Sequence, residues 1–212
     1  MWLTAPNRLG MAGWSFEGSF CPLEVTPGTA VTLGRDGGAI ELSVSASQGL
    51  PELRDQYVRG DDLHLTFPQE EPHQFGIELC IRPLPHIGSA HAGWLGFEWM
   101  VSIQTTWLDS HPTVDLSATG ARDSKIAPEG VFQFESEVGR AAVVLGRHDA
   151  PFVSVLPNGE ATRLRLFGQF LEKGVIRRAR PWVLLGHGRE GYPQGLIQGA
   201  AEALAESPVP LT

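Results

Sequence analysis

Cysteine is rare in this chain of 212 residues: only Cys21 and Cys80 occur, and they stand far apart. Because no C-x-x-C pair is present, a zinc ribbon or a thioredoxin-type redox site is excluded. Two cysteines allow one disulfide, but two reduced thiols in a cytoplasmic protein are the simpler expectation.

Long apolar runs and positive charge are also in short supply. No stretch reaches the roughly 18 apolar residues of a membrane-spanning helix. The first residues lack the basic and then apolar pattern of a secretory signal. The formal net charge of −8 at pH 7 disfavours non-specific phosphate contacts. We therefore expect a cytoplasmic protein that binds neither nucleic acid nor a membrane.

Most catalytic and nucleotide-binding motifs are missing as well. Neither G-x-S-x-G nor G-x-x-x-x-G-K-[ST] occurs, but one G-x-G-x-x-G runs from Gly186 to Gly191. A dinucleotide site needs a βαβ unit and an acidic residue about 20 positions later, at the end of the next strand. Only 21 residues follow Gly191, and the sequence before the motif has the pattern of antiparallel strands. We interpret the motif as a turn before a C-terminal helix and predict no cofactor.

Turn-forming residues and alternating strands are abundant. The 25 glycines and 16 prolines are spread along the chain, which favours many short strands over long helices. The clearest alternation runs from Trp94 to Thr105. Every second residue from Leu95 to Ile103 is apolar, so these side chains form one apolar stripe on one face of the strand. Shorter alternating segments run over 30–33, 39–45, 62–67, 75–82, 113–117, 131–135, 141–145, 152–156 and 162–166.

Two helices are predicted. Residues 194–206 have helical spacing and are followed by Pro208, and residues 166–173 precede Gly174, a residue type that often ends helices. The sequence thus predicts one domain over 1–212, mainly β, built as a two-sheet antiparallel β-sandwich or a flattened barrel. The C-terminal helix could cover the sheet, or its alanine-rich side could form a homodimer.

The polar side of the predicted sheet is the main candidate site. Carboxylates and arginines there could bind the hydroxyl groups of a polar small molecule such as a carbohydrate, with a tryptophan stacked on the sugar ring. The candidate ligand-binding residues are Glu78, Arg82, Trp94, Glu98, Gln104, Arg178 and Arg180, and Arg163 and Arg165 could join them. A solvent-exposed sheet face with cross-strand ion pairs is the commoner explanation for such a pattern.

Catalytic and metal sites are weaker alternatives. Glu98 and His64 could form an acid–base pair for a sugar-modifying enzyme of the epimerase or hydrolase type. His86 and His91 lie in an eleven-residue segment, 83–93, that reads as a long loop, but their spacing matches no familiar metal motif. Three functions remain open: a non-catalytic binding module, an acid–base enzyme, and an oligomerising scaffold.

Overall fold

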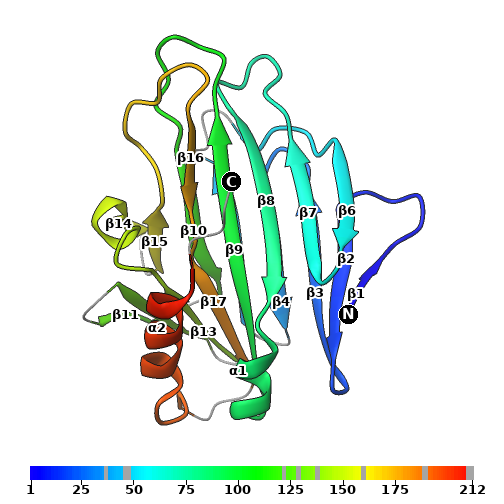
Figure 1. The fold of residues 1–212 in the computed structure, drawn as a ribbon, viewed down its shortest axis with the longest axis vertical. Coiled ribbons are helices and arrows are strands. Elements are labelled where there is room, and N and C mark those ends of the chain that lie inside the picture. The colour runs from blue at the N-terminus through cyan, green and yellow to red at the C-terminus, as the bar shows by residue number, and fades with distance from the viewer. Residues whose placement is uncertain are drawn as a thin grey trace.

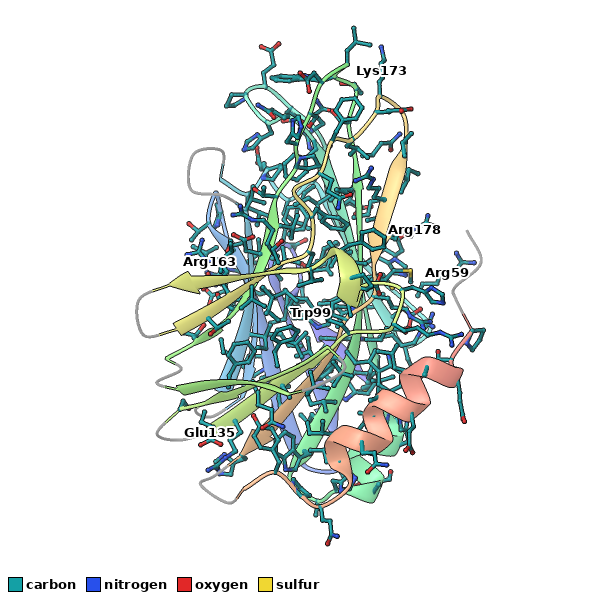
Figure 2. The ribbon with its side chains drawn as sticks, turned by 90° about the vertical axis from the view of Figure 1, so that its left-hand side faces the viewer. Arg59, Trp99, Glu135, Arg163, Lys173 and Arg178 are labelled. Carbon is teal, nitrogen blue, oxygen red and sulfur yellow. The ribbon has the colours of Figure 1, made fainter. Side chains whose placement is uncertain are left out.

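The computed structural model describes residues 1–35, 38–44, 49–120, 123–127, 130–136, 139–158, 161–187 and 191–208. Within these ranges the strands pair antiparallel in two sheets. Figure 1 looks onto one sheet with the other behind it, and Figure 2 places Trp99 in the interior between them. The prediction of a mainly β, two-sheet antiparallel sandwich is confirmed.

Each sheet combines strands from distant parts of the chain. The first sheet has the order β1 (Trp2–Thr4), β2 (Met11–Phe16), β3 (Ser19–Thr26), β4 (Ala30–Arg35), β5 (Gly38–Val44), β10 (Val114–Thr119), β15 (Ala161–Arg165), β14 (Ser154–Asn158). The second has the order β11 (Asp123–Ala127), β12 (Val131–Glu135), β13 (Gly139–Val144), β17 (Trp182–His187), β9 (Trp94–Gln104), β8 (Gly76–Pro83), β7 (Asp62–Phe67), β6 (Asp55–Arg59), and β16 (Ile176–Ala179) also pairs with β9. The helical elements are α1 (Pro85–Ala90), α2 (Leu196–Glu206) and a short 3-10 turn (Ala150–Phe152).

Alternating side chains decide which faces of the two sheets meet. In β7, Leu63, Leu65 and Phe67 are buried, and the residues between them are partly exposed. The predicted apolar stripe of β9 is buried in the same core, and Trp99 within it has no exposed surface. Burial of these inner faces is the main source of stability in such a sandwich.

A second apolar layer lies on the outer face of the second sheet. Strands β13 and β17 carry runs of buried residues, Ala141–Val144 and Trp182–Leu185, because both of their faces are covered. Helix α2 covers the outer face with Leu196, Ala200 and Leu204, which recur every four residues. Figure 1 shows α2 in red beside β13. The predicted C-terminal helix is confirmed. Within the described part of the chain, neither helix has the length and apolar character to cross a membrane.

The predicted helix over 166–173 is wrong. This segment is irregular: Leu171 forms an isolated bridge with Ser110, and the N–H of Leu166 bonds to the carbonyl of Val114. Leu166 and Leu171 are both buried in the main core. The prediction rested on Gly174 as a helix-ending residue, but both leucines pack into the sandwich core, so tertiary packing overrides the local preference.

The predicted loop 83–93 contains helix α1. Its Ile87 is buried, and a Cβ added to Gly96 on β9 would come within 2.7 Å of the Ile87 side chain. The helix therefore packs directly on the strand. Strands β1, β2, β3, β6 and β11 were not predicted: β1, β6 and β11 are short, β2 contains Gly13, and β3 contains Pro22, a residue type that argues against a strand interior. Gly188, Arg189 and Glu190 of the glycine motif lie outside the described residues.

Strand β9 shares one edge between two partners. β17 pairs with its first half, from Trp94 to Glu98, and β16 pairs with its second half, from Val101 to Gln104. Between them the N–H of Trp99 bonds to the carbonyl of Pro181 at 2.9 Å. This junction places Arg180 over the centre of the sheet, next to the end of α2.

Candidate ligand-binding site

Three rows of side chains cross the outer face of the second sheet, because paired residues on neighbouring strands point to the same side. The first row joins Thr66, Glu78, Ser102 and Arg178. The second joins Tyr57, His64, Cys80 and Met100. The third joins Arg82, Glu98 and Trp182, with Asp62 beside Arg82. The predicted polar face therefore exists, although only part of it is open to solvent.

Glu98 lies at the centre of a hydrogen-bonded cluster and is only 4% exposed. Its Oε1 accepts a bond of 3.2 Å from the indole N–H of Trp182 and lies 3.5 Å from Nε of Arg180. Its Oε2 accepts a bond of 3.4 Å from Arg82. A buried carboxylate needs such partners, and here both of its oxygens are engaged.

Arg180 connects this cluster to the end of α2. Its guanidinium donates to the carbonyl oxygens of Leu204, Ser207 and Pro208 at 2.6 to 3.4 Å. A cation at this position satisfies carbonyls that have no partner within the helix and interacts favourably with the helix dipole. Arg180 thus holds the last turn of α2 against the sheet.

A hollow of about 450 Å³ opens beside this junction. We call it the β16 hollow, since it follows that strand. Its lining residues are Met100, Gly146, Arg147, His148, Asp149, Ile176, Arg178, Ala179, Arg180, Leu204, Ala205 and Ser207. The wall carries three arginines and one histidine against a single carboxylate. Figure 2 shows Arg178 on the same side of the molecule as α2.

Asp149, the one acidic residue among those that line the hollow, is hydrogen-bonded to the backbone. Its Oδ2 accepts the N–H of Arg180 at 3.1 Å. Burial raises the pKa of Asp149 above its ordinary value, and the bond and positive charge of Arg180 partly oppose that shift. The charge of Asp149 acts on Arg180 and His148, and among the described residues no ion pair joins it to Arg147 or Arg178.

Two further hollows flank the same strand. One of about 350 Å³ is lined by His148, Phe152, Phe167, Arg177 and neighbouring residues. The other, of about 330 Å³, contains Glu78, Gln104, Ser102 and Gln69. The predicted residues therefore fall into two groups: Arg178 and Arg180 line the β16 hollow, whereas Glu78 and Gln104 line a separate one.

Other predicted residues lie away from these hollows. Trp94 is only 6% exposed and packs against Tyr192 at 5.2 Å between ring centres, so the expected open stacking surface is absent at this residue. Arg163 and Arg165, expected on the same face, belong to the other sheet and pair with Asp115. His86 in α1 stands 5.8 Å from the ring of Trp182, and His91 follows the helix.

Sequence reasoning missed Arg147, His148 and Asp149 as lining residues. They lie in the turn between β13 and the short 3-10 segment, where no periodic pattern marks them. Their only sequence signal is the charged run Arg147-His148-Asp149 itself. Their position beside β16 depends on tertiary structure.

Comparisons with known proteins support the fold and no more. No protein-family model matches the chain, and no curated protein sequence matches it either. Among solved structures, the chain is similar to a heparan sulfate lyase HepC mutant from Pedobacter heparinus, with a TM-score of 0.54 and 7% sequence identity. The match covers 89% of this chain but only 38% of the lyase chain. The chain is thus similar in fold to a minor part of that protein.

Proposed function

We propose that this protein is a non-catalytic module that binds a negatively charged carbohydrate in the β16 hollow. The observation that carries the proposal is the pair of exposed arginines in the hollow wall, Arg147 and Arg178, beside an Arg180 whose charge is balanced by Glu98. In a chain with a net charge of −8, this local excess of positive charge is unusual.

The donors that remain free favour an anionic ligand. Arg147 and Arg178 are exposed, and within the described part of the chain neither pairs with a carboxylate. Arg178 donates only through Nε, to the hydroxyl of Ser102 at 3.2 Å, which leaves its terminal nitrogens available. Guanidinium groups bind carboxylate and sulfate oxygens in pairs of parallel hydrogen bonds.

The size and apolar part of the hollow suit a sugar. A volume of about 450 Å³ is within the range of small-molecule sites, roughly 300 to 1,000 Å³. Met100, Ile176 and Leu204 supply apolar surface for the C–H faces of a sugar ring. The similar fold belongs to a protein named for heparan sulfate, which agrees with this ligand class, but at 7% identity the charge of the hollow carries the argument.

The test is calorimetric titration with two oligosaccharides of equal length, one sulfated and containing uronate, the other neutral. We expect binding of the charged one only, weakened by added salt because the contacts are ionic. Arg178→Ala and Arg147→Ala should each lower affinity about tenfold, since a hydrogen bond to a charged group contributes about 1.5 to 3 kcal/mol.

The matched control is Arg8→Ala, which removes an exposed arginine from a turn of the first sheet. Its affinity should equal that of the unmodified protein. Equal binding of the neutral oligosaccharide, or unchanged affinity in Arg178→Ala, would contradict the proposal.

The alternative, an acid–base enzyme using Glu98 and His64, has less support. Glu98 is enclosed and hydrogen-bonded through both oxygens. His64 lies on β7, and β8 separates that strand from β9, which carries Glu98. A general base needs a free lone pair within reach of its substrate. The scaffold alternative and the possible homodimer remain predictions, although the apolar side of α2 is already occupied by the sheet.

A further inference from the structure

Asp62, His64 and Cys80 come together on the outer face of the second sheet. The carboxylate, imidazole and thiol each present one ligand atom, and all three atoms lie within 4.8 Å of one another. Each residue is partly exposed, so an ion could reach them from solvent. Asp62 and His64 are two apart on β7, and Cys80 is the cross-strand partner of His64 on β8. The sheet register itself therefore fixes the cluster.

The ligand set selects among metals. A thiolate, an imidazole nitrogen and a carboxylate are the three donors that Zn²⁺ takes in proteins, whereas Ca²⁺ and Mg²⁺ require oxygen donors. Two donors bound at about 2.0 and 2.3 Å to one tetrahedral ion lie roughly 3.5 Å apart. Sγ of Cys80 lies 3.9 Å from Nε2 of His64, so small side-chain rotations suffice. We propose that Asp62, His64 and Cys80 form a Zn²⁺ site, separate from the β16 hollow.

Neighbouring side chains already orient the proposed ligands. Arg82 donates to both oxygens of Asp62, at 2.9 and 2.7 Å, and this leaves lone pairs on the carboxylate for an ion. Tyr57 stacks on His64 with the rings 4.7 Å apart and nearly parallel, at 6°. Such supporting contacts hold the ligands of a metal site in place.

Charge and coordination are consistent with a bound ion. A thiolate and a carboxylate together carry the two negative charges that match Zn²⁺, and Glu98, whose Oε2 lies 3.4 Å from Arg82, adds a third negative charge beside Arg82 and Arg180. Three protein ligands leave a fourth position open to water or another small ligand, the arrangement of an accessible zinc site rather than a closed structural one.

The first experiment uses Co²⁺ as a spectroscopic probe of the reduced, metal-free protein. A thiolate bound to Co²⁺ gives a ligand-to-metal charge-transfer band in the near ultraviolet. We expect the band in the unmodified protein and in Cys21→Ala, because Cys21 is fully buried elsewhere. The band should be absent in Cys80→Ser. No band in the unmodified protein, or a band that persists in Cys80→Ser, would overturn the proposal.

The second experiment measures Zn²⁺ affinity by competition with a chromophoric chelator. His64→Ala and Asp62→Asn should lose more affinity than Arg82→Gln, a change in a positioning residue expected to cost about tenfold. The double variant His86→Ala, His91→Ala is the control and should bind as the unmodified protein does. If the control loses affinity and His64→Ala does not, the zinc site lies at α1 and the proposal is wrong.

Each variant is checked for folding by circular dichroism and by its thermal midpoint without metal. Excess Zn²⁺ should raise the midpoint of the unmodified protein, because an ion that binds only the folded state stabilises it by mass action. In a folded Cys80→Ser variant the same excess should leave the midpoint unchanged. An equal rise in both would show that Zn²⁺ binds elsewhere.

Discussion

At the residue scale, buried carboxylates are paired with arginines, and Asp115 is the clearest case. It has no exposed side-chain surface, and it accepts two bonds from Arg165, at 2.8 and 3.0 Å, and one of 3.4 Å from Arg163. Arg163 and Arg165 on β15 were expected to join the candidate ligand-binding residues, which lie on the other sheet. Their position shows that a side chain's charge does not tell which sheet it belongs to.

The unequal bonding of Asp115 gives a paired prediction. Arg165→Ala should lower the free energy of unfolding by about 2 to 3 kcal/mol, because it removes two charged hydrogen bonds from a buried carboxylate. Arg163→Ala should cost less, since it removes one longer bond. Urea unfolding of both variants measures the difference. Equal losses would mean that the two arginines contribute alike to the burial of Asp115.

Cys80 gives a prediction on reactivity. Burial, and then the negative charge of Asp62, raise the pKa of its thiol from 9.0 to about 11, while Arg82 opposes the shift. Since only the thiolate reacts, alkylation of Cys80 in the folded, metal-free protein at pH 9 should be roughly tenfold or more slower than in the urea-unfolded chain. Mass spectrometry of iodoacetamide-treated protein gives both rates. Similar rates in the two states would show an ordinary thiol.

At the scale of elements, helix α2 depends on the sheet beneath it. It begins at Leu196 after Gly195, which takes a left-handed conformation with φ of 79°, and no side chain caps this end. Its other end is held by Arg180 from the β16–β17 junction. Such a short helix is only marginal by itself, so packing rather than propensity stabilises it.

This dependence predicts the effect of two substitutions on α2. Leu204→Ala should lower the free energy of unfolding by about 2 to 5 kcal/mol, because the side chain is buried against the sheet. Gln198→Ala removes only an exposed contact with Glu202 and should change stability by less than about 0.5 kcal/mol. Chemical denaturation measures both. A small loss in Leu204→Ala would show that α2 adds little to the fold.

At the scale of the whole molecule, one core joins the two sheets. The main cluster of buried residues includes Leu33 and Leu42 from the first sheet and Phe97 and Val183 from the second. Neither sheet can keep its apolar face covered without the other. The shared core agrees with the prediction that residues 1–212 form one domain.

A shared core predicts cooperative unfolding. Scanning calorimetry should give one transition in which the calorimetric and van't Hoff enthalpies agree, because loss of one sheet exposes the inner face of the other. Two separated transitions, or a calorimetric enthalpy well above the van't Hoff value, would indicate that the sheets unfold independently.

Much of the architecture followed from the sequence. Alternation identified β7, β8, β9, β12 and the hairpin of β4 and β5 within about one or two residues, and with them the sandwich. The apolar stripe of β9 was assigned to the core correctly, because a period of two fixes which side chains share a face. The C-terminal helix was found from its spacing and from the proline after it.

The candidate site was predicted only in part, because the local sequence pattern does not determine the order of the strands in a sheet. The polar face of β7, β8 and β9 was expected, but the burial of Trp94 under the α2 layer was not. The β16 hollow also needs the turn at Arg147 to lie beside Arg178, 31 residues later. By itself, the sequence determined strands and their faces; tertiary structure alone decided which charges meet, because strand order depends on the packing of distant segments.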